Sequence, residues 1–194
     1  MTSDTCTPWD PSSCEGTTGC PPRCPRFVDK HGSVLLVEPV TEATIDGIVE
    51  MYRDYPDEHR SMGLPPAVPR LLTDWVEMLH EDGVSFVARD GDRVVGHAAY
   101  TPESAAVPGF VVFVDPDVHD RGIGSELCRQ IIAYAADAGH DALKLDVDAD
   151  NERAVHVYKR MGFRVIGRNG GDLEIRLSFD EPIAETVRLP PAKR

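Results

Sequence analysis

The stretch that decides the fold is VFVDPDVHDRGIGSEL, from Val112 to Leu127. The apolar run Phe110 to Val114 is typical of a strand buried on both faces, and Gly122 then opens a long amphipathic helix that we expect to reach Ala138. Backbone N–H groups in the first turn of a helix have no partner within the helix, and the helix dipole places partial positive charge there. A glycine has no Cβ to block an approaching anion. The stretch therefore predicts a phosphate-binding loop.

Two common phosphate motifs do not fit this loop. A dinucleotide-binding turn needs a third glycine, and Leu127 stands in its place. The loop of nucleotide hydrolases needs Gly-Lys followed by Ser or Thr, which is absent. Because Gly-x-Gly is a weak signal by itself, its meaning depends on the segment that follows.

That segment is LKLDVDADNERAVHVYKRMGF, Leu143 to Phe163, which predicts a strand and then a helix. The two stretches together resemble the Gcn5-related N-acetyltransferase (GNAT) superfamily, whose pyrophosphate loop is followed by a strand and by an Asn-x-x-Ala-x-x-x-Tyr-x-x-x-Gly-Phe helix. Here that pattern reads Asn151, Ala154, Tyr158, Gly162 and Phe163. The resemblance covers residues 34–180. It implies an α/β (α+β) acyl-CoA N-acyltransferase fold, a central mixed β-sheet with a splayed strand pair flanked by four helices.

Periodicity and turn residues predict the remaining elements. We expect strands at 34–40, 84–89, 93–100, 142–147, 163–168 and 173–179, and helices opening at Thr41 and covering 70–82 and 151–161. We divide the chain into a Cys- and Pro-rich extension outside the core (1–33), the N-acetyltransferase domain (34–180) and a C-terminal tail (181–194).

The resemblance implies acetyl-CoA as cosubstrate and assigns residues to it. Free backbone groups on the splayed strand, at Val112, Phe113 and Val114, pair with its pantetheine arm, and Asn151 holds the arm from the other side. The loop around its pyrophosphate comprises His119, Asp120, Arg121, Gly122, Ile123, Gly124 and Ser125. Arg121 could instead be a solvated surface charge. His119 stands where family members usually have Gln or Arg, so its role is open.

The resemblance also makes Tyr158 the general acid that protonates the departing thiolate, although it could simply pack on the inner face of its helix. Several relatives carry a glutamate on the strand before the loop, but Gly109 to Val112 contains no acid. Glu103 is the first choice for the base, and a water chain is an equal alternative. Further candidates are His97, Asp115, Glu38, Asp57, Glu58 and His59. A lone histidine in an apolar strand is more often a core residue, and Asp115 before a proline is more often a turn former.

The charge balance excludes several partners. The chain has 33 acidic and 20 basic residues, a net charge of −13, so its surface repels nucleic acid and anionic lipid. No apolar run approaches the roughly 18 residues needed to span a membrane. The first residues lack the basic and apolar segments of a secretory signal, so we expect a cytoplasmic protein. Aspartate exceeds glutamate, and four lysines stand beside sixteen arginines, which predicts a halophilic protein or an acidic protein from a GC-rich genome.

Four of the five cysteines, Cys6, Cys14, Cys20 and Cys24, fall in the first 24 residues. Their spacing contains no Cys-x-x-Cys pair and matches no usual zinc pattern, so we expect a loosely packed segment and no metal, with a zinc site as the alternative. Cys128 is expected to be a small buried apolar residue.

The predicted activity is direct transfer of an acetyl group from acetyl-CoA to a primary amine. The acceptor loop, residues 53–69, mixes acidic and basic side chains, so a small-molecule amine is favoured and a protein lysine or N-terminal amine is the alternative. A protein that binds acyl-CoA without turnover is a third interpretation. An exposed final hairpin can support a homodimer, and the oligomeric state stays open.

Overall fold

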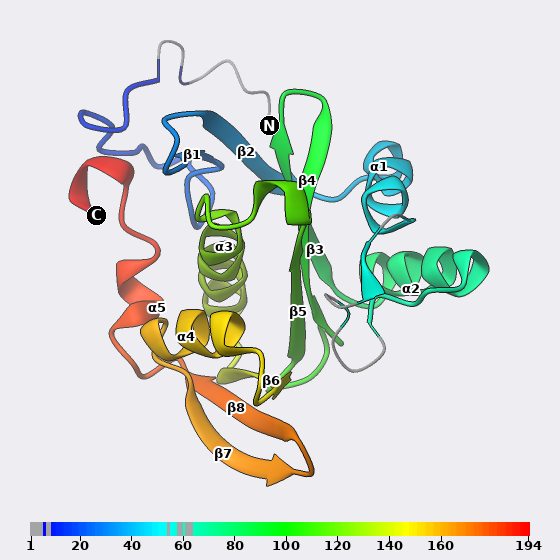
Figure 1. Ribbon diagram of the computed structural model, residues 1–194. Coiled ribbons are helices and arrows are strands. Elements are labelled where there is room, and N and C mark those ends of the chain that lie inside the picture. The colour runs from blue at the N-terminus through cyan, green and yellow to red at the C-terminus, as the bar shows by residue number, and fades with distance from the viewer. Residues whose placement is uncertain (1–5, 7–8, 54, 58–59, 61–63) are drawn as a thin grey trace.

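The structure is a computed structural model that describes residues 6, 9–53, 55–57, 60 and 64–194. It contains an eight-stranded sheet with the order β1-β2-β3-β4-β5-β6-β8-β7 (Figure 1). Neighbouring strands are antiparallel except β5 and β6, which are parallel, so the predicted mixed sheet is confirmed. The strands are β1 (Arg26–Val28), β2 (Val34–Pro39), β3 (Val84–Asp90), β4 (Arg93–Thr101), β5 (Gly109–Val114), β6 (Ala142–Asp148), β7 (Arg164–Asn169) and β8 (Asp172–Ser178).

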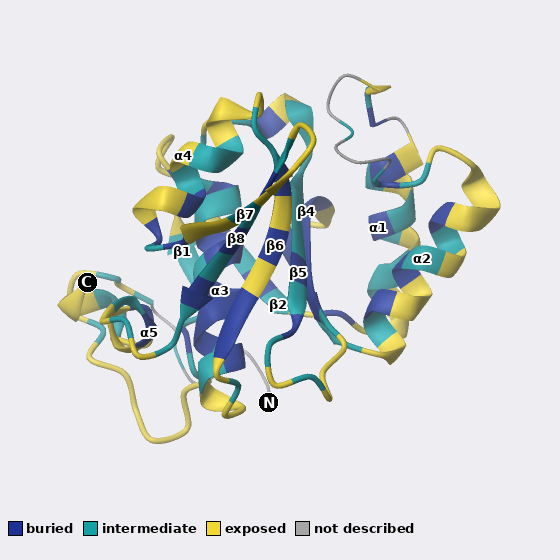
Figure 2. Ribbon diagram, turned by 90° about the horizontal axis from the view of Figure 1, so that it is seen from below, coloured by how far each residue is buried: buried dark blue, intermediate teal, exposed yellow. Residues whose placement is uncertain are grey.

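Four main helices flank the sheet, as predicted: α1 (Glu42–Arg53), α2 (Pro69–Glu81), α3 (Ile123–Asp137) and α4 (Glu152–Arg160). α1 and α2 lie on one face, and α3 and α4 lie on the other (Figure 1). Each pair covers its own apolar cluster: Ile48 and Leu72 are buried under the first pair, and Leu127 and Ile131 under the second. Exposed residues lie on the outer sides of α1, α2 and α4, away from the sheet (Figure 2).

The parallel pair β5 and β6 diverges, as the splayed strand pair was expected to do. The two strands share one register pair, Gly109 with Lys144, among the described residues, whereas β5 pairs with β4 along its full length. The prediction that this strand is buried on both faces is wrong: Phe110 is buried, and the residues from Val111 to Val114 are partly exposed. The missing ladder leaves one edge of β5 without a neighbouring strand.

The hydrogen-bond alternation of an antiparallel pair identifies which groups face this open edge. Asp115 N–H donates to Val95 O (3.1 Å), so that pair is hydrogen-bonded, and the next pair, Val114 with Gly96, is not. Val114 and, two residues earlier, Val112 therefore turn their N–H and C=O groups away from β4. Phe113 turns its groups toward β4. The free backbone groups expected at Val112, Phe113 and Val114 are thus concentrated at the two valines.

Residues 26–28 belong to the sheet and Arg23 is buried, which corrects the expectation that the residues before Val34 lie outside the core. β1 pairs with β2, and Arg23 is 3% exposed. Its guanidinium donates to both carboxylate oxygens of Glu126 on α3 (2.6 and 2.8 Å) and to Val187 O. A charge so deeply buried is stable only when it is paired. The partner of Arg23 is 103 residues away, so no local pattern could predict the contact.

The C-terminal tail also packs against the domain. A short helix α5 (Ile183–Thr186) follows β8, and Ala184 and Val187 are buried. Two 3-10 segments complete the elements, η3 (Pro116–Val118) and η4 (Pro191–Lys193).

The five cysteines are free thiols in the structure, and Cys128 is buried in the core as expected. Within the described part of the chain, no group of three or more His, Cys, Asp or Glu residues could hold a metal ion. No helix in that part is long and apolar enough to cross a membrane.

Candidate active site

The loop between β5 and α3 presents backbone amides at the start of the helix. Gly122 is the N-cap residue with a φ of 94°, a conformation that glycine adopts without strain. The first helical hydrogen bond runs from Glu126 N–H to Gly122 O (3.1 Å), so the N–H groups of the intervening residues, Ile123, Gly124 and Ser125, point out of the helix end. A Cβ on Gly124 would lie 3.3 Å from Val114 Cγ2, which shows how closely the loop approaches β5. This arrangement suits a diphosphate, as predicted.

Three side chains predicted to contact the pyrophosphate are engaged elsewhere. Arg121 Nε donates to Asp29 Oδ2 (2.5 Å), and its Nη2 donates to Asp90 Oδ2 (3.0 Å). The hydrogen bond to Asp29 is the main cause of a raised pKa for Arg121. Burial would raise the pKa of Asp29, but hydrogen bonds from Arg121 and from two backbone N–H groups outweigh it and lower that pKa. Arg121 is therefore an ion-paired residue and not a solvated surface charge, and its contact with the pyrophosphate stays a prediction.

His119 and Asp120 are linked to α4 through Arg153. His119 Nε2 lies 3.0 Å from Val114 O, and its Nδ1 lies 2.5 Å from Arg153 Nη1. Asp120 Oδ2 lies 3.5 Å from Arg153 Nη2. Asp120 also has a φ of 63°, which is unusual for a residue with a side chain. The predicted contacts of His119 and Asp120 with the pyrophosphate stay predictions.

Asn151 begins α4 as its N-cap residue. Its Oδ1 accepts a hydrogen bond from Ala154 N–H (3.1 Å), which satisfies one of the amides that a helix start leaves unpaired. The predicted contact with the pantetheine arm would have to use the amide nitrogen of the side chain, because the oxygen is committed to the cap.

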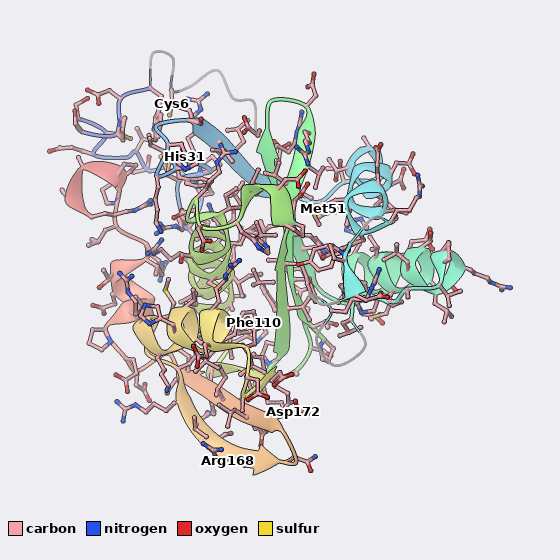
Figure 3. All side chains as sticks on the ribbon, viewed as in Figure 1. Cys6, His31, Met51, Phe110, Arg168 and Asp172 are labelled. Atoms are coloured by element: carbon pink, nitrogen blue, oxygen red, sulfur yellow. The ribbon has the colours of Figure 1, made fainter. Side chains whose placement is uncertain are left out.

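Tyr158 lies on α4 near the diverging strands. Its ring packs edge-to-face on Phe110 of β5 (centroids 5.8 Å apart) and on Phe163 (5.6 Å), and Figure 3 shows Phe110 between β5 and α4. The residue is 8% exposed and lines a cavity of about 210 Å³ with Val147 and Leu173. Burial, with a smaller contribution from Cys128, raises the pKa of the phenol far above its usual value. The hydroxyl therefore stays protonated near neutral pH, as a proton donor must.

The first choice for the base, Glu103, lies exposed in the loop between β4 and β5. Its backbone N–H donates to Asp82 O (2.9 Å), and its carboxylate does not line the cavity at Tyr158. The structure does not bring these two residues together. Glu103 stays a prediction, as does the water chain.

His97 is a core histidine, the alternative interpretation raised above. It is 0% exposed, its Nδ1 lies 2.8 Å from Tyr52 Oη, and burial lowers its pKa to about 3. A base this weak and this deeply enclosed is a poor acceptor for the proton of an ammonium ion.

The remaining base candidates are held by arginines or lie outside the described residues. Glu38 pairs with Arg89 (2.8 Å) and Asp57 pairs with Arg60 (3.1 Å). Asp115 pairs with Arg93 (2.5 Å) and accepts from Asp117 N–H, so it is the turn former that its proline predicted. Glu58 and His59 lie outside the described residues.

A second cavity, of about 270 Å³, brings the loop and α4 together. Gly122 and Ser125 line it from the loop side, and Val157 and Arg160 line it from α4. The anion-binding amides and the helix that carries Tyr158 are therefore neighbours. Lys30, from the segment after β1, also lines this cavity, and nothing in its local sequence marked it as a site residue.

The sequence matches the model of the "Acetyltransferase (GNAT) family" over residues 46–163, more than half of the chain. The chain belongs to the GNAT family. The matched range contains β3 to β6, the loop, α3 and α4, so it covers the diverging strands and both helices of the candidate site.

Two curated relatives of this GNAT chain are named for different acceptors. Mycothiol acetyltransferase of Rhodococcus jostii is 36% identical over 86 residues, which cover 41% of this chain and 28% of the relative. Peptidyl-lysine N-acetyltransferase YjaB of Salmonella typhimurium is 33% identical over 96 residues, which cover 50% of this chain and 60% of the relative. The matched region thus spans less than two thirds of the length of either relative.

Among solved structures, yncA of Salmonella typhimurium, determined with its cofactor acetyl-CoA, is similar to this GNAT chain with a TM-score of 0.63. The match has 18% sequence identity and covers 76% of this chain and 95% of yncA. The likeness shows that the two chains share the fold, including the mixed sheet.

Proposed function

We propose that this GNAT chain transfers an acetyl group from acetyl-CoA to a primary amine by direct attack. The observation that carries the proposal is that β5 links three features: its own open edge, the unpaired amides at the start of α3, which follow its end, and the buried phenol of Tyr158, which packs on Phe110 near its beginning. Each feature fits a different part of the acetyl donor. Membership in an acetyltransferase family supports the same activity.

Backbone groups hold the donor in this proposal. The amides of residues 122–125 take the diphosphate, where the helix dipole favours negative charge. The outward C=O of Val112 and the N–H of Val114 take the amide groups of the pantetheine arm, in the manner of an added strand, and the outward N–H of Val112 is left for the acetyl carbonyl. Val114 O already accepts from Tyr55 and lies beside His119, so it is the less accessible acceptor.

The reaction needs an oxyanion donor and a proton for the leaving sulfur. An outward backbone N–H on β5 supplies the first, and one such donor is worth about 3 kcal/mol. Tyr158 supplies the second: the amine attacks the thioester carbon, which forms the carbon–nitrogen bond and the oxyanion, and as the oxyanion collapses the carbon–sulfur bond breaks and the Tyr158 hydroxyl gives its proton to the thiolate. The phenolate then regains a proton from the water that carries the proton lost by the amine. A thiol of pKa about 8.5 is a good leaving group, so it needs only modest help to leave.

The amine must lose a proton before it attacks, because a lysine-like ammonium has a pKa of about 10.4. We propose that water carries this proton to Glu103 or to bulk solvent. Glu38, Asp57 and Asp115 are each paired with an arginine, and His97 is enclosed in the core, which supports the solvent route.

We favour a small-molecule amine as the acceptor. In this proposal the segment between α1 and α2 contributes to the acceptor side, and the mixed charges of its sequence suit a small zwitterionic or cationic amine. A protein lysine is the second candidate, because the relative YjaB is named for peptidyl-lysine.

The activity is tested by following free CoA thiol with acetyl-CoA and a panel of amines, including polyamines, amino acids and lysine peptides. Replacement Tyr158→Phe should lower kcat about 100-fold and leave the Kd for acetyl-CoA unchanged. Tyr134→Phe is the matched control, because Tyr134 also packs edge-to-face on a phenylalanine, Phe86, but lies outside the site. Tight binding with no amine-dependent thiol would instead identify a non-catalytic acyl-CoA sensor.

The cellular setting is part of the proposal. We propose a cytoplasmic protein, because free cysteines persist in reducing compartments. We propose that the folded unit includes residues from about Arg23 onward, since Arg23 and Asp29 pair with residues of the domain. The edge strand β7 exposes Val165 and Ile166, which supports a homodimer through the final hairpin.

A further inference from the structure

The second cavity, beside the start of α3, concentrates positive charge in an acidic protein. Five basic side chains line it, and Glu126 is its one acidic residue among the described part of the chain. The basic residues are Lys30, Arg121, Arg129, His156 and Arg160. Because the whole chain carries a net charge of −13, this sign is the reverse of the general surface.

Ion pairs within the protein neutralise some of the basic side chains that line this cavity, but not all of them. Glu126 is paired with Arg23 and lies 3.4 Å from Arg129, and Arg121 is paired with two aspartates. Lys30 and Arg160 have no ion-pair partner among the described residues. Two uncompensated cations therefore face one cavity, Lys30 from the turn after β1 and Arg160 from α4.

The N-terminal segment fixes the position of Lys30. Its backbone N–H donates to Arg121 O (3.1 Å), and the ion pair of Asp29 with Arg121 holds the preceding residue. The side chain of Lys30 runs over Gly122: its Cγ and Cε each lie 4.0 Å from the position that a Cβ on Gly122 would occupy. The aliphatic part of Lys30 therefore lies beside Gly122, and both residues line the cavity.

We propose that Lys30 and Arg160 bind the 3′-phosphate on the ribose of CoA and make this chain selective for CoA over carriers that lack that phosphate. The inference rests on the proposed function, which places the diphosphate on the adjoining amides. CoA carries one further phosphate beyond its diphosphate, and this cavity is the neighbouring site with free positive charge. Lysine and arginine are the side chains that bind phosphate by charge-assisted hydrogen bonds.

The test compares the binding of CoA and 3′-dephospho-CoA by calorimetry, for the wild-type chain, Lys30→Ala and Arg160→Ala. The control is Arg168→Ala, which removes one positive charge from β7; Figure 3 shows Arg168 at the opposite end of the molecule from His31, the neighbour of Lys30. The wild type should bind CoA at least about 10-fold more tightly than 3′-dephospho-CoA. Lys30→Ala and Arg160→Ala should each weaken CoA binding about 10-fold and leave the binding of 3′-dephospho-CoA unchanged, so each reduces the preference for CoA over 3′-dephospho-CoA. The control Arg168→Ala should keep the wild-type preference.

Three results would overturn the inference. A wild-type chain that binds both compounds equally has no 3′-phosphate site. If the variants weaken the binding of both compounds equally, the replaced side chains act on the diphosphate or through the overall charge of the protein, and not on the 3′-phosphate. In both of these cases the proposed function stands as long as the wild type binds CoA tightly. The third result is a wild-type chain that binds neither CoA, 3′-dephospho-CoA nor acetyl-CoA, which would overturn both the inference and the proposed function. Lys30→Arg, which keeps the charge, should retain most of the preference.

Discussion

Protonation of His97 should set how the stability of the protein falls in mild acid. The imidazole is 0% exposed on β4, between Tyr52 (centroids 5.7 Å apart) and Trp75 (6.5 Å). Its Nδ1 lies 2.8 Å from Tyr52 Oη, and no hydrogen-bond partner of its Nε2 lies in the described part of the chain. A second proton on this ring would place a charge in the core, and burial accordingly lowers the pKa of His97 to about 3.

The sign and size of the effect follow from linkage. In the unfolded chain a histidine has a pKa of about 6.5, so below that pH the unfolded state takes up a proton that the folded state refuses. A group whose folded pKa is depressed contributes stability that is complete above its unfolded pKa and is lost as the pH falls. The loss approaches about 1.4 kcal/mol per pH unit, or about 2 kcal/mol between pH 6.5 and pH 5. That is a large part of the roughly 5–15 kcal/mol typical of a domain.

The measurement is the free energy of unfolding in urea at pH 7.5, 6.5, 5.75 and 5.0, at constant ionic strength. The variant His97→Gln removes the titrating group and keeps a polar atom for Tyr52. The wild type should lose about 2 kcal/mol more than the variant between pH 7.5 and pH 5.0, whatever the difference between them at pH 7.5. Parallel curves for the two proteins would refute the reasoning, because they would mean that the folded state protonates His97 as easily as the unfolded state does.

Three further predictions concern the N-terminal segment, the loop and the surface charge. Replacement Arg23→Ala should lower the free energy of unfolding by about 3–5 kcal/mol, because it leaves Glu126 buried without its partner. A double variant, Arg23→Met with Glu126→Leu, should recover most of that loss. If Arg23→Ala lowers the free energy of unfolding in urea by less than about 1 kcal/mol, the predicted contact is contradicted. Asp120→Gly should stabilise the protein by about 1 kcal/mol, since glycine adopts a φ of 63° without strain; a lower thermal midpoint would show that the Arg153 ion pair matters more. If the chain is halophilic, its Tm should rise steadily with potassium chloride, because salt screens the repulsion within a net charge of −13; a highest Tm at low salt would exclude this.

The secondary structure could be predicted from the sequence because its signals are local. The apolar spacing in α3 and the glycines at its start, for example, set the bounds of that helix within one residue. The order of elements then placed Gly122 and Tyr158 near each other, and the cavity beside the loop shows that their segments are neighbours. These signals need no knowledge of residues far along the chain.

The parts that could not be predicted depend on contacts between distant residues. Arg121 looked like a phosphate ligand from its position in the loop, but its partners Asp29 and Asp90 lie 92 and 31 residues away. The segment before Val34 has no periodicity, and yet the buried pair of Arg23 with Glu126 joins it to α3. Hydrogen-bond alternation along β5, which distinguishes Val112 from Phe113, follows from the register with β4 and is likewise invisible in the residues themselves.

The divergence of β5 and β6 leaves the sheet as two slabs, β1 to β5 and β6 to β8, bridged in the ladder at Gly109 and Lys144 among the described residues. In the proposed complex, the pantetheine arm of acetyl-CoA lies between these two parts of the sheet. It forms hydrogen bonds where β5 and β6 do not pair with each other, and so it connects the two parts. Occupancy should therefore slow amide hydrogen exchange across the joint, on β5 and in the first turn of α3, while the far edges of the sheet exchange as before. In the proposed complex, the acetyl donor thus becomes a structural part of the sheet as well as a substrate.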